Sequence, residues 1–224
     1  MASGERGLGH SAPILAALGS FVTLLAGGPG YGVAVAGGYL LGSIPIALLV
    51  GRRSAGVDLR GVGDRNPGYW NAKETLGRRR AVPVFVGDAL KGVAAGLVGN
   101  LCGGGWVTYA AVAAGMVGHA WPLFAGFRGG RSILTFAGGI CVISPPAGGI
   151  AIAALLLVTA TTRSFAWGAR VGVFSVPIIQ AVVDSPKRGA ATFLLQSIIG
   201  LRFLQAGLAT RRQPPPEPRP DPTA

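Results

Sequence analysis

Long runs without a charged residue alternate along this chain with short segments rich in arginine and lysine. Positions 11–51 contain no charged residue, and a second uncharged run covers positions 132–162. A helix needs about 20 mostly apolar residues to cross the hydrocarbon core of a bilayer, so both runs are long enough to span it. Helices satisfy their own backbone hydrogen bonds within lipid, and the alternation typical of a membrane barrel is not visible. The pattern therefore predicts an all-α integral membrane protein.

The apolar segments predict seven transmembrane helices when they are counted from Tyr31. The stretch 133–161 is too long for one ordinary span, and Pro145-Pro146 near its middle would interrupt the helical hydrogen-bond ladder. We expect this stretch to form two shorter helices that turn at the prolines. The predicted spans are residues 31–50, 81–101, 106–125, the two helices within 133–161, 171–183 and 190–208.

Both ends of the chain differ from this predicted membrane domain, 31–208. Residues 12–25 are apolar and are followed by Gly27-Gly28-Pro29-Gly30. We expect segment 1–30 to carry an extra membrane helix, with a signal-like leader as the alternative. Residues 209–224 are rich in proline and have too few apolar residues to bury a core, so we predict a disordered tail.

The distribution of charge adds an orientation to this picture. The chain has a net charge of +12 but only 12% charged residues, whereas a soluble domain carries about a quarter. The bases lie in short loops between apolar spans, where they set membrane orientation and do not indicate nucleic-acid binding. The loop at positions 51–80 carries eight bases against three acids, which predicts that this loop and the C-terminus are cytoplasmic. Cys102 and Cys141 indicate neither a disulfide framework nor a metal site.

The first of three polar constellations joins the end of a span to the long basic loop. It comprises Gly42-Ser43-Ile44-Pro45, Asp58-Leu59-Arg60 and the stretch Gly63-Asp64-Arg65-Asn66-Pro67-Gly68-Tyr69-Trp70-Asn71. Glycines and asparagines around a proline favour a turn with exposed backbone N–H groups, which bind anions, and nearby guanidinium groups strengthen that preference. A plain solvated loop is the alternative interpretation.

The other two constellations lie within or beside apolar spans. Asp88 and Lys91 share one helix face at i and i+3, and ionisable groups inside a membrane face a cavity or a partner. They fit either a structural ion pair or a substrate contact. The third constellation runs from Gly118-His119 to Phe127-Arg128-Gly129-Gly130-Arg131, where glycines that precede a helix N-terminus allow the close approach of a phosphate.

The order and spacing of these residues resemble the acyl-phosphate-dependent glycerol-3-phosphate acyltransferases, bacterial membrane enzymes of phospholipid synthesis. That family's pattern runs as G-S-I-P, then D-x-R-x-x-G-S-G-N-P-G-A-T-N-x-x-R-x-x-G, D-x-x-K-G, G-H-x-x-P-x-F and F-K-G-G-K-G-x-A-T. The chain matches it in order at most positions, including Ser43, Arg60, Asn66, Gly68, Asn71, Asp88, Lys91, His119, Gly129 and Gly130, with Arg131 where the family has lysine.

The resemblance implies a seven-helix bundle in the bacterial plasma membrane with a cytoplasm-facing site. It implies transfer of a fatty acyl group from acyl phosphate to the 1-hydroxyl of glycerol 3-phosphate, giving lysophosphatidic acid, without a cofactor or a metal. We assign His119 to catalysis. The residues assigned to binding of the phosphorylated substrates are Ser43, Arg60, Arg65, Asn66, Gly68, Asn71, Lys91, Gly129, Gly130 and Arg131.

Departures from the family pattern concentrate in the first and last motifs. Asp64 stands where the family has serine, Arg65 where it has glycine, and Glu74 where it has arginine. We hypothesise that Arg65 supplies the lost cation and that Asp64 acts as a base toward the acceptor hydroxyl. The family's last motif, H-R-E-N-I-x-R-L-x-x-G-x-E, is echoed only by Arg202 and Gly207. A non-catalytic paralogue that binds lipid phosphates or a partner enzyme is the alternative function, and a transporter is a third.

Overall fold

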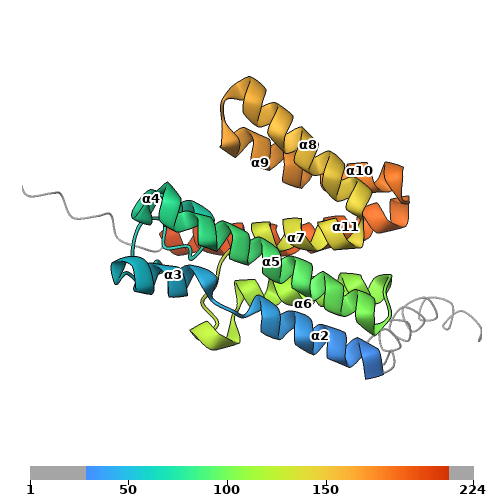
Figure 1. Ribbon diagram of the computed structural model, residues 1–224, viewed down its shortest axis with the longest axis horizontal. Coiled ribbons are helices and arrows are strands. Elements are labelled where there is room, and N and C mark those ends of the chain that lie inside the picture. Colours follow the sequence, from blue (N-terminus) through green and yellow to red (C-terminus); the bar gives the residue numbers. More distant parts are fainter. Residues whose placement is uncertain (1–28, 212–224) are drawn as a thin grey trace, which may run out of the picture.

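The computed structural model describes residues 29–211, and every regular element within them is helical (Figure 1). The predicted N-terminal helix or leader and residues 212–224 of the predicted tail lie outside this range. The elements, in order, are α2 (Pro29–Gly42), α3 (Ile46–Ala55), α4 (Tyr69–Leu76), α5 (Arg78–Cys102), α6 (Trp106–Ala120), the 3-10 turn η1 (Leu123–Ala125), α7 (Ile133–Ile143), α8 (Pro145–Thr162), α9 (Phe165–Phe174), α10 (Val176–Val183) and α11 (Pro186–Arg211).

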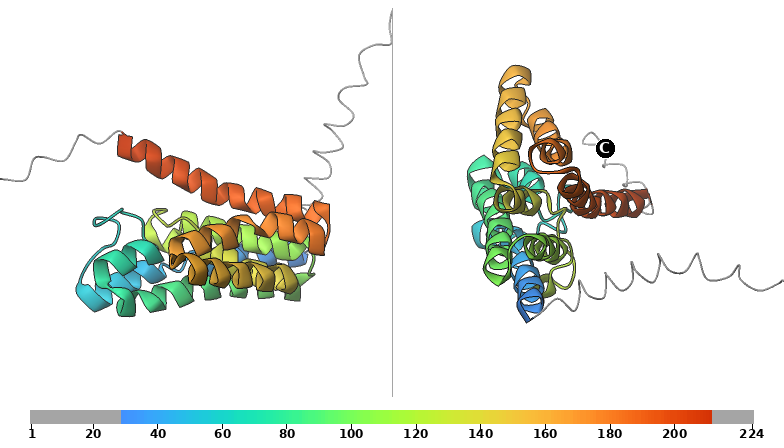
Figure 2. Two further views of the ribbon diagram at one scale, coloured as in Figure 1. Left: turned by 90° about the horizontal axis from the view of Figure 1, so that it is seen from above. Right: turned by 90° about the vertical axis from the view of Figure 1, so that its right-hand side faces the viewer.

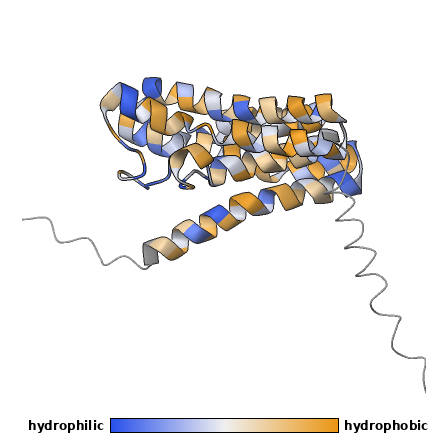
Figure 3. Ribbon diagram, turned by 90° about the horizontal axis from the view of Figure 1, so that it is seen from below, coloured by the Kyte–Doolittle hydropathy of each residue, from blue (hydrophilic) through white to orange (hydrophobic). Residues whose placement is uncertain are grey.

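The helices have the lengths and apolar surfaces of membrane spans. Five helical segments in the described part of the chain are long and apolar enough to cross a bilayer, and the bent pair α9–α10 makes a sixth. The apolar helix α7 has 11 residues, fewer than a membrane span needs. Side chains such as Leu101, Leu157 and Leu194 are more than half exposed on the helix surfaces, where lipid would cover them. The hydropathy colouring of Figure 3 shows hydrophobic residues along the lengths of the helices. The predicted all-α membrane fold is confirmed.

The predicted span 31–50 is not one continuous helix. α2 ends at Gly42, and Ser43-Ile44-Pro45 separates it from α3, because proline has no N–H to continue the hydrogen-bond ladder. α3 then runs beyond the predicted boundary to Ala55. The predicted loop 51–80 is also partly helical, since it contains α4. The chain thus carries a polar break and a short helix beside the charged end of the bundle.

The break at the paired prolines is confirmed, and a second break is new. Ser144 caps α8, and the prolines occupy its first turn, where the missing N–H groups cost nothing. The predicted span 171–183 begins earlier than expected, because Ser164 caps α9 by accepting a hydrogen bond from the Trp167 backbone N–H. This segment bends by 41° between α9 and α10. It is therefore two helices instead of the single segment predicted.

Glycines bring two helix pairs into backbone contact. A Cβ at Gly38 or Gly42 of α2 would collide with a carbonyl oxygen of α6, and a Cβ at Gly92 of α5 would collide with the Thr135 carbonyl of α7. In membranes such small residues let helices approach closely enough for van der Waals packing to hold them together. Gly38 and Gly42 are four residues apart, so both lie on the face of α2 that contacts α6. Tight α2–α6 and α5–α7 pairs form the frame around the site.

Two parts of the molecule stand apart from this frame. The α8–α9 hairpin diverges from α5 and α7 in Figure 1, and α11 crosses the other long helices at an angle in Figure 2. The hairpin contacts α4 through the rings of Phe165 in α9 and Tyr69 in α4, which meet edge-on with their centroids 6.3 Å apart. The space between the hairpin and the frame is a groove lined by α5, α7, α8 and α9.

Candidate functional site

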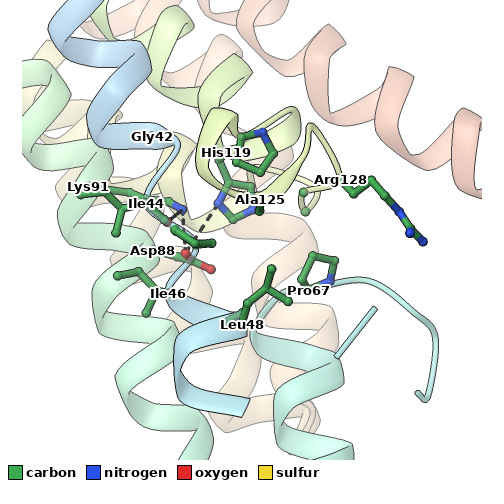
Figure 4. Close-up of a pocket in the computed structure, with 15 residues that line it drawn as sticks. Gly42, Ile44, Ile46, Leu48, Pro67, Asp88, Lys91, His119, Ala125 and Arg128 are labelled. Atoms are coloured by element: carbon green, nitrogen blue, oxygen red, sulfur yellow. Dashed lines mark hydrogen bonds and ion pairs between the residues drawn. The ribbon is translucent and has the colours of Figure 1, made fainter. Parts of the chain in front are cut away.

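Three ionisable side chains meet inside the bundle. Asp88 and Lys91 come from α5, and His119 comes from the last turn of α6. The Asp88 Oδ1 atom lies 2.9 Å from Lys91 Nζ and 3.5 Å from His119 Nδ1, and all three residues are more than nine-tenths buried. Figure 4 shows these side chains turned toward one another. Because buried charges in a membrane helix are costly without partners, this cluster is a candidate functional site.

The helix break beside the cluster supplies a further contact. Lys91 Nζ donates a hydrogen bond to the Ile44 carbonyl oxygen at 3.2 Å, and that carbonyl belongs to the break between α2 and α3. A continuous helix would have used this carbonyl within its own ladder. The Ser43-Ile44-Pro45 break therefore helps to hold the ammonium group in place.

A polar cavity opens next to the cluster. It contains about 250 Å³ of space, counted with the solvent at its opening, and the Ile44–Leu48 segment forms much of its wall. Asp88, Lys91 and His119 line it together with Gly129 and Gly130. Arg128 also borders this cavity, but its side chain is exposed and extends away from the cluster (Figure 4).

The groove below the α8–α9 hairpin is much larger and mainly apolar. It contains about 1760 Å³, counted in the same way, and helices α5, α7, α8 and α9 supply most of its walls. The lining of the groove includes the polar residues Asn66, Asp88, His119, Arg131 and Ser132. Asp88 and His119 thus border both the groove and the polar cavity.

The predicted glycine pair forms a strap across the end of α6. The N–H groups of Gly129 and Gly130 donate to the carbonyls of Ala120 and His119 at 3.2 and 3.1 Å. A Cβ at Gly130 would collide with Nε2 of His119, so glycine lets the strap lie against the imidazole. The strap N–H groups already have carbonyl partners, which differs from a nest that waits for an anion.

The strap is fixed from its other side by α11. Arg202 Nη2 donates to the Gly129 carbonyl oxygen at 2.7 Å, and Arg202 Nε donates to the Gly130 carbonyl oxygen at 3.0 Å. The guanidinium also lies over the Trp121 ring, 5.2 Å from its centroid. The one arginine that echoed the family's last motif therefore contacts the strap beside His119.

Charges in the long loop form a separate network. Asp58 pairs with Arg60 at 2.7 Å and with Arg52 at 3.1 Å, and Arg60 Nη1 also donates to the Ala125 carbonyl oxygen at 2.9 Å. Hydrogen bonds from Arg60, above all, hold the pKa of the Asp58 carboxyl far below its ordinary range, and the same pair raises the pKa of Arg60. Arg60 thereby attaches the loop to the η1 turn at the rim of the polar cavity.

Asn71 also stabilises the fold of the long loop. Its side-chain amide donates to the carbonyls of Leu59 and Val62 at 2.9 and 3.0 Å, and it is almost fully buried. The loop therefore folds around this amide.

Asp64 and Arg131 form an ion pair that joins the long loop to the start of α7. Asp64 Oδ2 lies 3.1 Å from Arg131 Nη1, and Asp64 Oδ1 accepts a hydrogen bond from the Asn66 N–H. The Arg131 guanidinium also lies over the Phe203 ring of α11. Arg65 is exposed, with a left-handed backbone at φ 59°. The assignment of Asp64 as a base stays a prediction, and its carboxylate already has Arg131 as a partner.

The structure divides the predicted site residues among three places. Lys91, His119, Gly129 and Gly130 line the polar cavity, while Asn66, Gly68, Arg131 and again His119 line the groove. Five of the predicted residues line neither space: Ser43, Arg60, Asp64, Arg65 and Asn71. Among the described residues no cluster of three or more His, Cys, Asp or Glu side chains could hold a metal ion.

Some residues of the site were not assigned to it from the sequence. Asp88 was noted as a charged residue inside a span, and that signal was sufficient to find it. Tyr69, Trp70 and Phe165 at the edge of the groove carry no such signal, because aromatic residues are common at membrane interfaces.

Fold and site together define a polytopic membrane protein whose buried charged cluster separates a polar cavity from an apolar groove. A family model described as glycerol-3-phosphate acyltransferase matches residues 32–207. The chain belongs to this family, as its motifs indicated.

Individual relatives agree over most of the chain. A glycerol-3-phosphate acyltransferase of Clostridioides difficile (strain 630) is 39% identical over 173 residues, which cover 72% of this chain and 82% of that protein. One from Synechococcus sp. (strain JA-2-3B'a(2-13)) is 34% identical and covers 69% of this chain and 77% of its own.

Two solved structures are similar as well. Both are of PlsY (YgiH), an integral membrane glycerol 3-phosphate acyltransferase, in a glycerol 3-phosphate form and a lysophosphatidic acid form. Their TM-scores are 0.69 and 0.66 at 27% and 26% identity, and they cover 81% and 80% of this chain and 92% of each solved chain.

Proposed function

We propose that this protein transfers a fatty acyl group from acyl phosphate to the 1-hydroxyl of glycerol 3-phosphate, giving lysophosphatidic acid. The observation that carries the proposal is the position of Asp88 and His119 between two unlike spaces. One space is small and bordered by the charged cluster, and the other is large and apolar. A reaction that joins a small phosphorylated polyol to a fatty chain needs both spaces to meet at the reacting atoms.

Each substrate has a matching place. The fatty chain lies in the groove, where burial of its methylenes supplies binding energy, and its acyl-phosphate end lies near Arg131 and the start of α7. Glycerol 3-phosphate enters the polar cavity, where Lys91 is the nearest buried cation for its phosphate. The 1-hydroxyl then points toward the junction at His119.

In the transfer, the 1-hydroxyl oxygen forms a bond to the acyl carbon, and the bond from that carbon to the phosphate oxygen breaks. The hydroxyl proton passes to His119, and inorganic phosphate leaves with the electron pair of the broken bond. Asp88, 3.5 Å from Nδ1, orients the imidazole so that Nε2 can accept the proton. Gly130 lies beside Nε2 and leaves it room only because glycine has no Cβ, which would collide with that nitrogen.

We further propose that the long basic loop and the C-terminal end of α11 face the cytoplasm. The loop at positions 51–80 carries eight bases against three acids, and an excess of lysine and arginine in short loops favours the cytoplasmic side. The polar cavity opens at this end, beside η1 and the α2–α3 break. In this orientation, glycerol 3-phosphate and acyl phosphate both enter the site from the cytoplasmic side.

The deciding experiment supplies palmitoyl phosphate and glycerol 3-phosphate to purified protein in bilayers and measures lysophosphatidic acid. We expect product with the wild type and roughly 10²–10⁴-fold less with His119→Gln, the range for loss of a general base. Cys102→Ala, which lies in neither cavity, serves as the matched control. Retained glycerol 3-phosphate binding without any product would instead support a non-catalytic paralogue.

A further inference from the structure

The last motif of the family is reduced here to one recognisable arginine, and that arginine occupies a specific place. Arg202 comes from α11, more than 70 residues along the chain from the glycine strap that it contacts. Its guanidinium donates to both strap carbonyls, one from Nε and one from Nη2. Arg202 lines neither the polar cavity nor the groove, so it does not contact a substrate placed in either.

The strap lies between Arg202 and the imidazole of His119. Gly129 and Gly130 donate their N–H groups to the carbonyls of Ala120 and His119, and the Gly130 backbone lies directly against His119 Nε2. All four polar backbone groups of the two glycines are therefore used, two toward α6 and two toward Arg202. Glycine without such bonds would be free to sample many backbone conformations.

We propose that Arg202 is a positioning residue that holds the Gly129–Gly130 strap against His119. This inference rests on the proposed function and extends it to a helix that lines neither cavity of the site. A guanidinium presents its N–H donors in a rigid planar fork, which fits two adjacent carbonyls. A lysine ammonium is a compact point donor and cannot reproduce that bridge, although it keeps the charge.

The test compares Arg202→Lys and Arg202→Ala with the wild type and with Gln205→Ala. Gln205 is exposed and accepts the remaining hydrogen bond of Arg202, so its loss leaves the strap bonds intact. We expect both Arg202 variants to lower kcat by roughly ten- to a hundredfold, the scale for a small misplacement at a catalytic group. The KM for palmitoyl phosphate should stay within about twofold, because the groove is untouched. Added guanidinium ion should partly restore Arg202→Ala, and Gln205→Ala should behave as the wild type.

A second readout does not depend on activity. Diethyl pyrocarbonate modifies accessible imidazoles, and mass spectrometry separates His119 from His10, the only other histidine of the sequence. His119 is 7% exposed, so we expect slow modification in the wild type and in Gln205→Ala, and faster modification in both Arg202 variants at unchanged thermal stability.

The outcomes separate the two proposals. Folded Arg202 variants with wild-type kcat and wild-type protection of His119 would overturn the positioning role. An equal rise in both KM values with no change in kcat would overturn it as well. If the wild type itself makes no lysophosphatidic acid, the proposed function fails, and the protection of His119 still decides whether Arg202 holds the strap.

Discussion

Asp58 lies outside the membrane spans, and neighbouring arginines strongly lower the pKa of its carboxyl. It accepts hydrogen bonds from the side chains of Arg52 and Arg60 and from the Arg60 backbone N–H, and its pKa is lowered as a result. A carboxyl whose folded-state pKa lies below its unfolded value of about 3.9 favours folding above that value. The contribution is then lost as the pH falls toward the folded pKa.

We therefore expect Asp58→Asn to lower the thermal midpoint of the purified protein by a few degrees between pH 5 and pH 8. Partly exposed ion pairs contribute about 1 kcal/mol or less, and 1 kcal/mol corresponds to about 2–4 °C for a chain of this size. Below about pH 4 the difference from wild type should shrink, because the unfolded wild-type chain then binds a proton at Asp58 that the folded state binds only at lower pH. Thermal unfolding in detergent across this pH range measures it.

Glu74→Gln is the matched control for this prediction. Glu74 pairs only with the adjacent Lys73, at 3.3 Å, and its side chain is 58% exposed. We expect the thermal midpoint of this variant to match that of the wild type. A deficit of Asp58→Asn that grew on acidification would contradict the stated direction of the Asp58 shift.

Residue types and spacing predicted part of the site, and the rest needed three dimensions. A charged pair at i and i+3 in an apolar span was enough to single out Asp88 and Lys91 as partners, and their ion pair is present. Nothing in the spacing showed that the Asn71 side-chain amide donates its hydrogen bonds to carbonyls of the loop. Motif residues that build a turn and motif residues that touch a ligand look alike in a sequence, because both need polar atoms in a defined place.

At the scale of helices, close packing across glycines sets the geometry of the site. A Cβ at Gly138 of α7 would collide with the Ala89 carbonyl oxygen and would lie 2.9 Å from its carbonyl carbon. Ala89 is adjacent to Asp88, so any added atom there pushes α7 away from the helix that carries the charged cluster. The atoms that such a Cβ would meet are backbone atoms, which cannot move aside as the end of a flexible side chain can.

Gly138→Ala should therefore destabilise the protein by about 1–3 kcal/mol, the range for overpacking a well-filled interior. Gly149→Ala is its control, because a Cβ at Gly149 of α8 meets no atom within 4 Å and alanine favours helix. Unfolding midpoints of the two variants, measured side by side, provide the comparison. Equal midpoints would show that α5 and α7 are not held at this distance.

Helix breaks were predictable where proline stands in a pair, and less so elsewhere. The turn at Pro145-Pro146 was expected from the missing N–H groups and is observed. Pro45 acts in the same way, but the apolar run around it hid the break between α2 and α3. The predicted span 171–183 starts after Arg170, whereas Ser164 caps a helix that already contains this arginine. Charge identifies a membrane boundary, not the end of a helix.

For the molecule as a whole, charge is distributed unequally between the two ends of the bundle. The end formed by α3, α4 and the start of α5 carries the basic loop, whereas the turn Gly103-Gly104-Gly105 at the opposite end has no charge. The start of α11 lies near that opposite end, since Tyr109 of α6 donates a hydrogen bond to the Arg188 carbonyl oxygen. The hydropathy pattern was sufficient to predict this alternation of ends, although not the groove between the hairpin and the frame.

Single cysteines at the two ends test the proposed orientation. Arg79→Cys at the start of α5 and Lys187→Cys at the start of α11 each remove one positive charge from an exposed position. Both are introduced into a variant that lacks Cys102 and Cys141, the two cysteines of the sequence. If the basic loop is cytoplasmic as proposed, a membrane-impermeant maleimide applied to intact spheroplasts should label Lys187→Cys and spare Arg79→Cys until the membrane is permeabilised. The reverse pattern would place the polar cavity on the outer face, away from any cytoplasmic supply of phosphorylated substrates.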